Sequence, residues 1–196
     1  MNTTLNYYNQ NADSFIAGTV SADMSAQYQF FLKFVPRKAK ILDLGCGSGR
    51  DSAYFASLGF DVVAVDGSAE LCKRAKEIYG IDAVCTLFED LSFDEEFDAV
   101  WACASLLHVS KKDMPNILKK VSAALKPEGV LYVSFKYGNT EHVSNGRFFN
   151  DYTEVDLATL LTEDNRLTLL KYWITEDVRP DRAGEQWLNF VAIKTR

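Results

Sequence analysis

The stretch Ile41-Leu42-Asp43-Leu44-Gly45-Cys46-Gly47-Ser48-Gly49-Arg50 decides the fold, because an apolar strand runs into three alternating glycines where a helix should begin. Glycine lacks Cβ, so it adopts positive φ and lets backbone amides approach a ligand closely. The pattern therefore predicts a loop that binds a nucleotide-type cofactor. Its G-x-G-x-G spacing, with Asp43 two residues before the first glycine, differs from the G-x-G-x-x-G that seats a dinucleotide pyrophosphate on a helix N-terminus.

A second acidic residue follows the next predicted strand. Residues 60–65 form an apolar run that ends at Asp66, and Gly67 and Ser68 come directly after it. A carboxylate at a strand end accepts hydrogen bonds from both hydroxyls of a ribose, and a separation of roughly 20 residues from the glycine loop suits one βαβ unit. The two motifs together predict a nucleoside-binding, doubly wound domain.

These motifs resemble motif I and the acidic strand end of the class I S-adenosylmethionine-dependent methyltransferases, and the resemblance extends over nearly the whole chain. Within that class, the run from Gly47 to Phe55 is most similar to the tellurite-resistance and thiopurine-type branch. The resemblance implies S-adenosyl-L-methionine as cofactor and methyl transfer to a small molecule, with a chalcogen oxyanion, a thiol or a carboxylate as acceptor. A nicotinamide-dependent oxidoreductase and a non-catalytic S-adenosylmethionine-binding protein remain as alternatives.

Apolar periodicity and turn residues predict alternating strands and helices, which is typical of an α/β fold with a mostly parallel sheet. The resemblance adds a Rossmann-like methyltransferase sheet of seven strands, in which an antiparallel C-terminal hairpin strand lies between strands five and six. We expect one domain, 1–196, with a helical cap over the cofactor at 1–38 and a core at 39–196. The predicted strands are 40–44, 60–65, 82–86, 97–102, 129–136, 166–177 and 186–194, and the predicted helices are 24–34, 50–58, 69–79, 112–125 and 153–161.

Composition excludes several classes of partner. The net charge is −6 and Lys and Arg form no stripe, so we expect no nucleic-acid partner. No apolar run reaches membrane-spanning length and the N-terminus does not resemble a signal peptide, so we expect a cytoplasmic protein, monomeric or homodimeric, without a membrane partner. The four cysteines lack metal-site spacing, which predicts neither a metal site nor a disulfide.

The resemblance also assigns roles around the cofactor. Asp43 orients the loop and the methionine ammonium, Asp66 holds the ribose, and Asp90 accepts from the adenine amino group. For Asp90 the alternative is a solvated acid in an acidic loop, and for Leu71 it is core packing. The expected cofactor-binding residues are Tyr7, Tyr8, Asp43, Gly45, Cys46, Gly47, Gly49, Arg50, Asp66, Gly67, Ser68, Leu71, Glu89, Asp90, Leu91, Ala102, Cys103 and Ser105.

Residues for the acceptor are expected at the same sheet edge. His108 follows the strand 97–102 and is a candidate general base; the alternative is a histidine that hydrogen-bonds a backbone carbonyl. Arg147 is a candidate clamp for a carboxylate or oxyanion, or else a surface ion pair with Asp151 or Glu154. The expected substrate-binding residues are Arg147, Phe148, Tyr152, Arg179 and Trp187.

Overall fold

The computed structural model describes residues 3–163, 166–179 and 182–195. Within these residues, seven strands form one sheet in the order β3-β2-β1-β4-β5-β9-β8. All neighbouring pairs up to β5 are parallel, whereas β9 is antiparallel to both β5 and β8. This sheet confirms the predicted fold. The strands are β1 (Lys40–Leu44), β2 (Asp61–Asp66), β3 (Val84–Cys85), β4 (Phe97–Ala102), β5 (Leu125–Lys136), β8 (Leu167–Glu176) and β9 (Gln186–Lys194).

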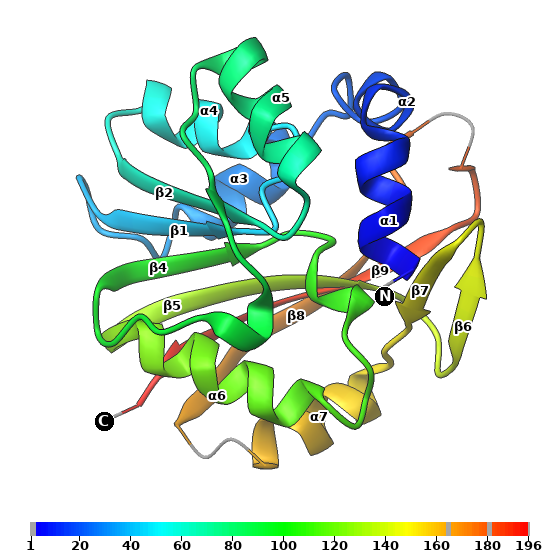
Figure 1. Cartoon of the computed structure of the whole chain (residues 1–196). Helices are drawn as coiled ribbons and strands as arrows, with labels where there is room; N and C mark the ends of the chain where they lie inside the picture. The colour runs from blue at the N-terminus through cyan, green and yellow to red at the C-terminus, as the bar shows by residue number, and fades with distance from the viewer. Residues whose placement is uncertain (1–2, 164–165, 180–181, 196) are drawn as a thin grey trace.

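Helices cover both faces of the sheet (Figure 1). One face carries α3 (Ser25–Phe31), α4 (Arg50–Ser57) and α5 (Ala69–Tyr79), and the other carries α6 (Met114–Ala124) and α7 (Glu154–Glu163). Two short N-terminal helices, α1 (Thr3–Gln10) and α2 (Ala12–Ala17), stand apart from these layers, and α1 packs between α5 and β7 (Arg147–Asn150).

Local signals explain where the helices begin and end. The Ser68 hydroxyl accepts a hydrogen bond from the Leu71 amide at 3.2 Å and caps α5, which ends at Gly80 with φ 70°. At α7, the Asp156 carboxylate accepts from the Thr153 amide at 3.0 Å, and the Thr153 hydroxyl accepts from the Asp156 amide at 3.3 Å. Side-chain oxygens therefore satisfy backbone amides at the start of both helices.

Two strands differ by two or more residues from their predicted extents. β3 is confined to residues 84–85, and β5 begins at Leu125 rather than at Gly129. The β4–β5 pairing shifts register between Phe97 and Ala99, so Pro127 lies at the irregular part of the ladder, where its missing N–H costs no hydrogen bond. A second hairpin, formed by β6 (Glu141–Ser144) and β7, was not predicted.

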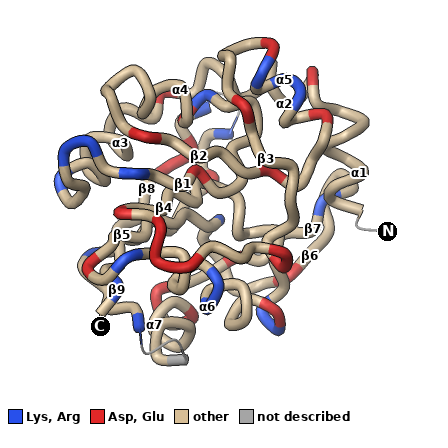
Figure 2. Tube along the Cα trace, turned by 60° about the vertical axis from the view of Figure 1, so that its left-hand side comes forward, with Lys and Arg blue, Asp and Glu red and all other residues tan. Residues whose placement is uncertain are grey.

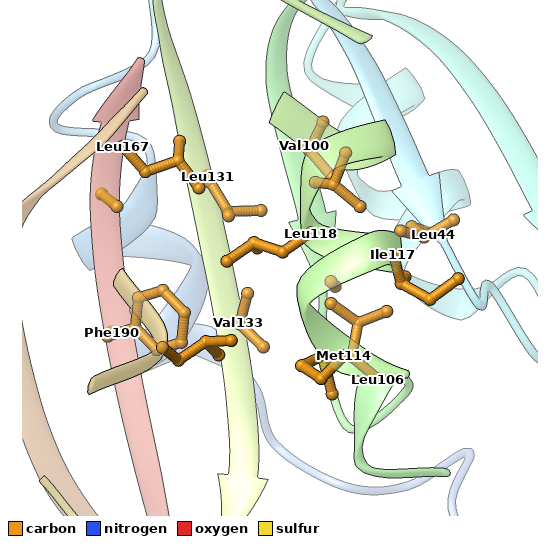
Figure 3. Close-up of a cluster of buried hydrophobic side chains, with 14 of the residues drawn as sticks. Leu44, Val100, Leu106, Met114, Ile117, Leu118, Leu131, Val133, Leu167 and Phe190 are labelled. Carbon is orange, nitrogen blue, oxygen red and sulfur yellow. The ribbon is translucent and has the colours of Figure 1, made fainter. Parts of the chain in front are cut away.

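The core has a different character on each side of the sheet. On one side, α6 places Met114, Ile117 and Leu118 against aliphatic side chains of β4 and β5 (Figure 3). On the other side, aromatic rings fill the space between the sheet and α3 and α4; Trp101 stacks on Tyr132 with ring centroids 4.0 Å apart. Burial of these large side chains is the main favourable contribution to folding.

Lys and Arg lie in short, separate segments of the chain, as Figure 2 shows, and an acidic run precedes β4.

None of the helices in the described ranges is both long enough and apolar enough to cross a bilayer.

Leu118 is 1% exposed, so we predict that Leu118→Ala lowers the free energy of unfolding by about 3 kcal/mol through lost burial and a residual cavity. Urea denaturation followed by circular dichroism measures this change. The matched control is Val155→Ala on α7, where the side chain is 72% exposed and the change should stay within about 0.5 kcal/mol. Equal losses in the two variants would contradict the assigned core.

Candidate active site

A cavity of about 660 Å³ opens at the carboxyl ends of the parallel strands. Ligands bind at this edge in open α/β sheets. Its walls come from the loop after β1, from the residues that follow β2, β3 and β4, and from α1, α2, the β6–β7 hairpin and the β8–β9 connection. Segments distant in the sequence thus surround one enclosed space.

The loop after β1 approaches the end of β4 too closely for a side chain. Gly45 has φ 81°, and a Cβ built on it would lie 2.3 Å from Cβ of Ser105. Ser105 is buried in the cavity wall, and its hydroxyl has no hydrogen-bond partner among the described residues. Ala104, just before it, has φ 51°, an uncommon backbone conformation for a residue with a Cβ. Glycine at position 45 is therefore required by this contact.

Asp66 joins this loop to the end of β2. One carboxylate oxygen accepts from the Gly47 amide at 2.9 Å and the other from the Ser68 amide at 2.8 Å. Burial raises the pKa of Asp66, and the bonds from Ser68 and Gly47 oppose that rise. The carboxylate lies on the cavity wall, where a ligand hydroxyl could donate to it.

Two further buried carboxylates lie beneath the loop. Asp51 accepts hydrogen bonds from Tyr28 at 2.6 Å, Trp101 at 2.8 Å and Arg50 at 2.6 Å. Asp43 accepts from the hydroxyl of Ser52 at 2.5 Å. Burial raises the pKa of Asp43, and the nearby charge of Asp51 raises it further. Asp51 and Arg50 line the cavity, whereas Asp43 lies behind it.

Apolar side chains line the part of the cavity near α5. Leu71, Leu87 and Phe88 contribute to this wall, and the side chain of Leu5 from α1 lies over Gly67, where an added Cβ would meet it at 2.9 Å. The turn η1 (Phe88–Asp90) directs Phe88 and Glu89 into the wall, whereas Asp90 is exposed and lies outside it. The structure thus corrects the assignment of Asp90 to the adenine site, because the turn carries its side chain away.

The N-terminal helices are fixed to the cavity rim by polar contacts. The Asn9 side-chain oxygen accepts from the Ser68 hydroxyl at 2.8 Å, and the Thr4 hydroxyl accepts from the Phe148 amide at 2.9 Å. Asp13 pairs with Arg74 of α5 at 3.0 Å. These contacts close one side of the cavity with residues that precede β1.

Tyr8 and His108 form a buried pair at this rim. His108 lies in η2 (Leu106–His108); its Nδ1 is 2.6 Å from the Phe148 carbonyl oxygen and its Nε2 is 2.8 Å from the Tyr8 hydroxyl. Because the carbonyl only accepts, Nδ1 carries the proton and Nε2 accepts from Tyr8. Burial lowers the pKa of His108 to about 4, so the ring is neutral at pH 7.

The structure sorts the expected acceptor residues. Arg147, Arg179 and Trp187 line the cavity, but Arg179 forms an ion pair with Asp177 at 2.6 Å. Tyr152 is in the core, stacked on Phe135 with centroids 4.3 Å apart, which corrects its assignment to the acceptor. Phe148 contributes its backbone amide and carbonyl to the neighbouring contacts, and its side chain is not part of the cavity wall.

Most of the expected cofactor residues lie on the wall, and several lie behind it. Those on the wall are Tyr8, Gly45, Cys46, Gly47, Arg50, Asp66, Gly67, Leu71, Glu89, Cys103 and Ser105. Those off the wall are Tyr7, Asp43, Gly49, Ser68, Asp90, Leu91 and Ala102, because they support the loops from behind, pack in the core or face solvent. Sequence reasoning missed the wall residues Thr4, Leu5, Phe15, Gln27, Asp51, Leu87 and Phe88, which carry no motif of their own.

Comparison with known proteins shows which proteins the chain resembles. Residues 41–129 match the family model described as a methyltransferase domain. The chain is 35% identical over 100 residues to a ubiquinone biosynthesis O-methyltransferase of Rhodopseudomonas palustris, covering 48% of this chain and 39% of that protein. It is 33% identical over 159 residues to a cypemycin N-terminal methyltransferase of a Streptomyces species, covering 79% of this chain and 60% of that protein. The chain spans less than half the length of the first curated relatives that it matches.

A solved structure shares the fold. The 1,6-didemethyltoxoflavin-N1-methyltransferase of Burkholderia thailandensis, with its substrate and S-adenosylhomocysteine bound, superposes with a TM-score of 0.77 at 24% identity, covering 98% of this chain and 85% of that chain. Residues 41–129 therefore resemble a methyltransferase domain, and the chain has the Rossmann-like fold of the solved methyltransferases.

Proposed function

We propose that this protein transfers a methyl group from S-adenosylmethionine to a small-molecule acceptor bound in the same cavity. The observation that carries the proposal is the Asp66 carboxylate on the cavity wall, bonded to the glycine loop through the Gly47 amide at 2.9 Å. The antiparallel β9 inside the sheet supports a methyltransferase over a nicotinamide-dependent oxidoreductase.

The residues on the wall suit the cofactor. Asp66 offers acceptors for a ribose diol, and the apolar wall of Leu71 and Phe88 suits an adenine ring. Arg50 and Asp51 place opposite charges at one end, which suits the zwitterion of a methionine. Gly45 and Gly47 present backbone without a side chain to the cavity, which allows a ligand to approach closely. When bound, S-adenosylmethionine supplies an electrophilic methyl group on a sulfonium.

The chain's own contribution is to position the reactants and exclude water. Helix α1 covers the cavity through Leu5 and Tyr8, and the Tyr8 hydroxyl is fixed by its bond to His108. His108 uses both ring nitrogens, and its lowered pKa makes it a poor proton acceptor at pH 7. We therefore assign His108 as a positioning residue for Tyr8, in place of the general base considered from the sequence.

The acceptor atom is not fixed by the family. The names of the relatives include an O-methyltransferase, a peptide N-terminal methyltransferase and a ring N-methyltransferase. Nothing in these comparisons favours the tellurite-resistance and thiopurine-type branch. The cavity of about 660 Å³, which the cofactor and the acceptor would share, has the size of a small-molecule site.

The proposal predicts that Asp66→Ala weakens binding of S-adenosylhomocysteine about 100-fold, since two hydrogen bonds to a carboxylate contribute about 3 kcal/mol together. Calorimetric titration of S-adenosylmethionine, S-adenosylhomocysteine and NAD measures this effect. The matched control is Asp61→Ala, at the exposed start of the same strand, which should bind like the unmodified protein. Binding of NAD in place of the adenosyl compounds would overturn the proposed function.

Transfer itself is tested by release of S-adenosylhomocysteine with a panel of phenols, amines, thiols, carboxylates and selenite. Product with one class of acceptor establishes catalysis. Tight binding of S-adenosylmethionine without product from any class would instead favour the non-catalytic binding protein.

The pKa of His108 predicts a pH effect on stability. The folded-state pKa is about 4 and the unfolded value is 6.5, so between these values the unfolded chain binds a proton that the native protein does not. Stability from this residue is present above pH 6.5 and decreases as the pH falls towards 4. Unfolding in urea should show the difference between the unmodified protein and His108→Gln shrinking by about 2 kcal/mol from pH 7 to pH 4.5. Parallel pH profiles of the two proteins would contradict the assignment.

A further inference from the structure

The β6–β7 hairpin brings one arginine into the cavity beside two aromatic rings. Its turn is Asn145-Gly146, with φ 49° and 77°, which is the type I′ geometry that favours a tight hairpin. Because side chains alternate along a strand, Arg147 and Phe149 project from the same face of β7. The guanidinium carbon of Arg147 lies 5.1 Å from the ring centroid of Phe149 and 4.6 Å from that of Tyr7.

The other cations on the cavity wall are already satisfied. Lys136 and Arg182 share Glu185, Arg179 pairs with Asp177, Arg50 pairs with Asp51, and Lys120 donates to the Leu91 carbonyl. Arg147 has no carboxylate within 4.0 Å among the described residues, and its buried Nε has no hydrogen-bond partner there. The two nearest acids proposed from the sequence have other partners: Asp151 faces His142, and Glu154 accepts from Tyr137.

A cation that lies against aromatic rings has lost part of its hydration, and the donors on its planar edge remain for an anion. An arginine fork binds a carboxylate through two parallel hydrogen bonds. On the strength of the proposed function, we infer that the methyl acceptor is an organic carboxylate, held by Arg147 beside Tyr7 and Phe149.

The neighbourhood of Arg147 favours an organic anion over an inorganic oxyanion. Tyr8, Phe149 and Trp187 give this end of the cavity an aromatic wall, which an acceptor with an apolar body would cover. Lys136 also lies 5.3 Å from the Phe149 ring, but Glu185 already pairs with it, so Arg147 is the cation left for the anion. Arg147 also hydrogen-bonds to the Tyr8 hydroxyl, so it lies beside the Tyr8–His108 pair. This bond and the charge of Arg147 lower the pKa of Tyr8, whereas burial raises that pKa by more.

The test is a calorimetric titration of benzoate into the 196-residue chain saturated with S-adenosylhomocysteine. Benzamide, the neutral isostere, and sodium selenite, an inorganic oxyanion, are titrated in parallel. We expect saturable binding of benzoate, at least tenfold weaker binding of benzamide, and weaker binding of selenite. Arg147→Gln should weaken benzoate binding at least tenfold, whereas Arg37→Gln, an exposed arginine with the same change of charge, should leave it unchanged.

Binding of S-adenosylhomocysteine is measured first for each protein and separates the two possible failures. If the unmodified protein does not bind it, the proposed function fails. If Arg147→Gln binds it normally and loses benzoate, the site is intact and the carboxylate site is established. Arg147→Lys keeps the charge without the fork and should weaken benzoate binding by a smaller factor. Equal affinity for benzoate in Arg147→Gln, equal affinity for benzamide, preference for selenite, or no benzoate binding to the loaded protein would each overturn the inference.

Discussion

The close approach of the loop after β1 to the end of β4 is the constraint on which the site depends. A Cβ at Gly45 would lie 2.3 Å from Cβ of Ser105, a separation that packed carbon atoms do not reach. The loop fits there only because residue 45 has no side chain and adopts φ 81°. From that position the Gly47 amide reaches Asp66 at the end of β2. One missing side chain thus aligns three strand ends around the same cavity.

Beneath this loop, buried carboxylates tie the cavity to the aromatic core. Asp51 binds Tyr28 from α3, Trp101 from β4 and Arg50 from its own helix, so three separate segments meet at one side chain. Buried charge is tolerated where hydrogen bonds satisfy it, and Asp51 accepts three. Its negative charge contributes, after burial, to the raised pKa of Asp43. The polarity at this end of the cavity therefore originates in contacts that also position the helix after the glycine loop.

The sequence allowed the sheet and the geometry of the glycine loop to be predicted because their signals are local. The glycine loop, Asp66, the cap at Ser68 and the stop at Gly80 each lie within a few residues of the structure they specify. Prediction failed where a turn or a tertiary contact determines the direction of a side chain. The turn η1 sends Asp90 outwards, and Tyr152 stacks in the core on Phe135. The dipeptide Asn145-Gly146 is a strong hairpin signal, and the β6–β7 hairpin could have been found from it.

The part of the cavity around Tyr8, His108 and Arg147 could not be predicted in this way, because no local sequence pattern specifies it. Tyr8 comes from α1, His108 from η2 and Arg147 from β7, and the first two are 100 residues apart in sequence although their polar atoms are 2.8 Å apart. None of the three residues stands out in the sequence from ordinary surface or core residues. They come together only because α1 packs against β7. The glycine loop and Asp66 are thus specified by two local motifs, whereas the contacts of Tyr8, His108 and Arg147 depend on tertiary assembly. Substitutions in the hairpin or in α1 can therefore change this part of the cavity while the glycine loop and Asp66 stay unchanged.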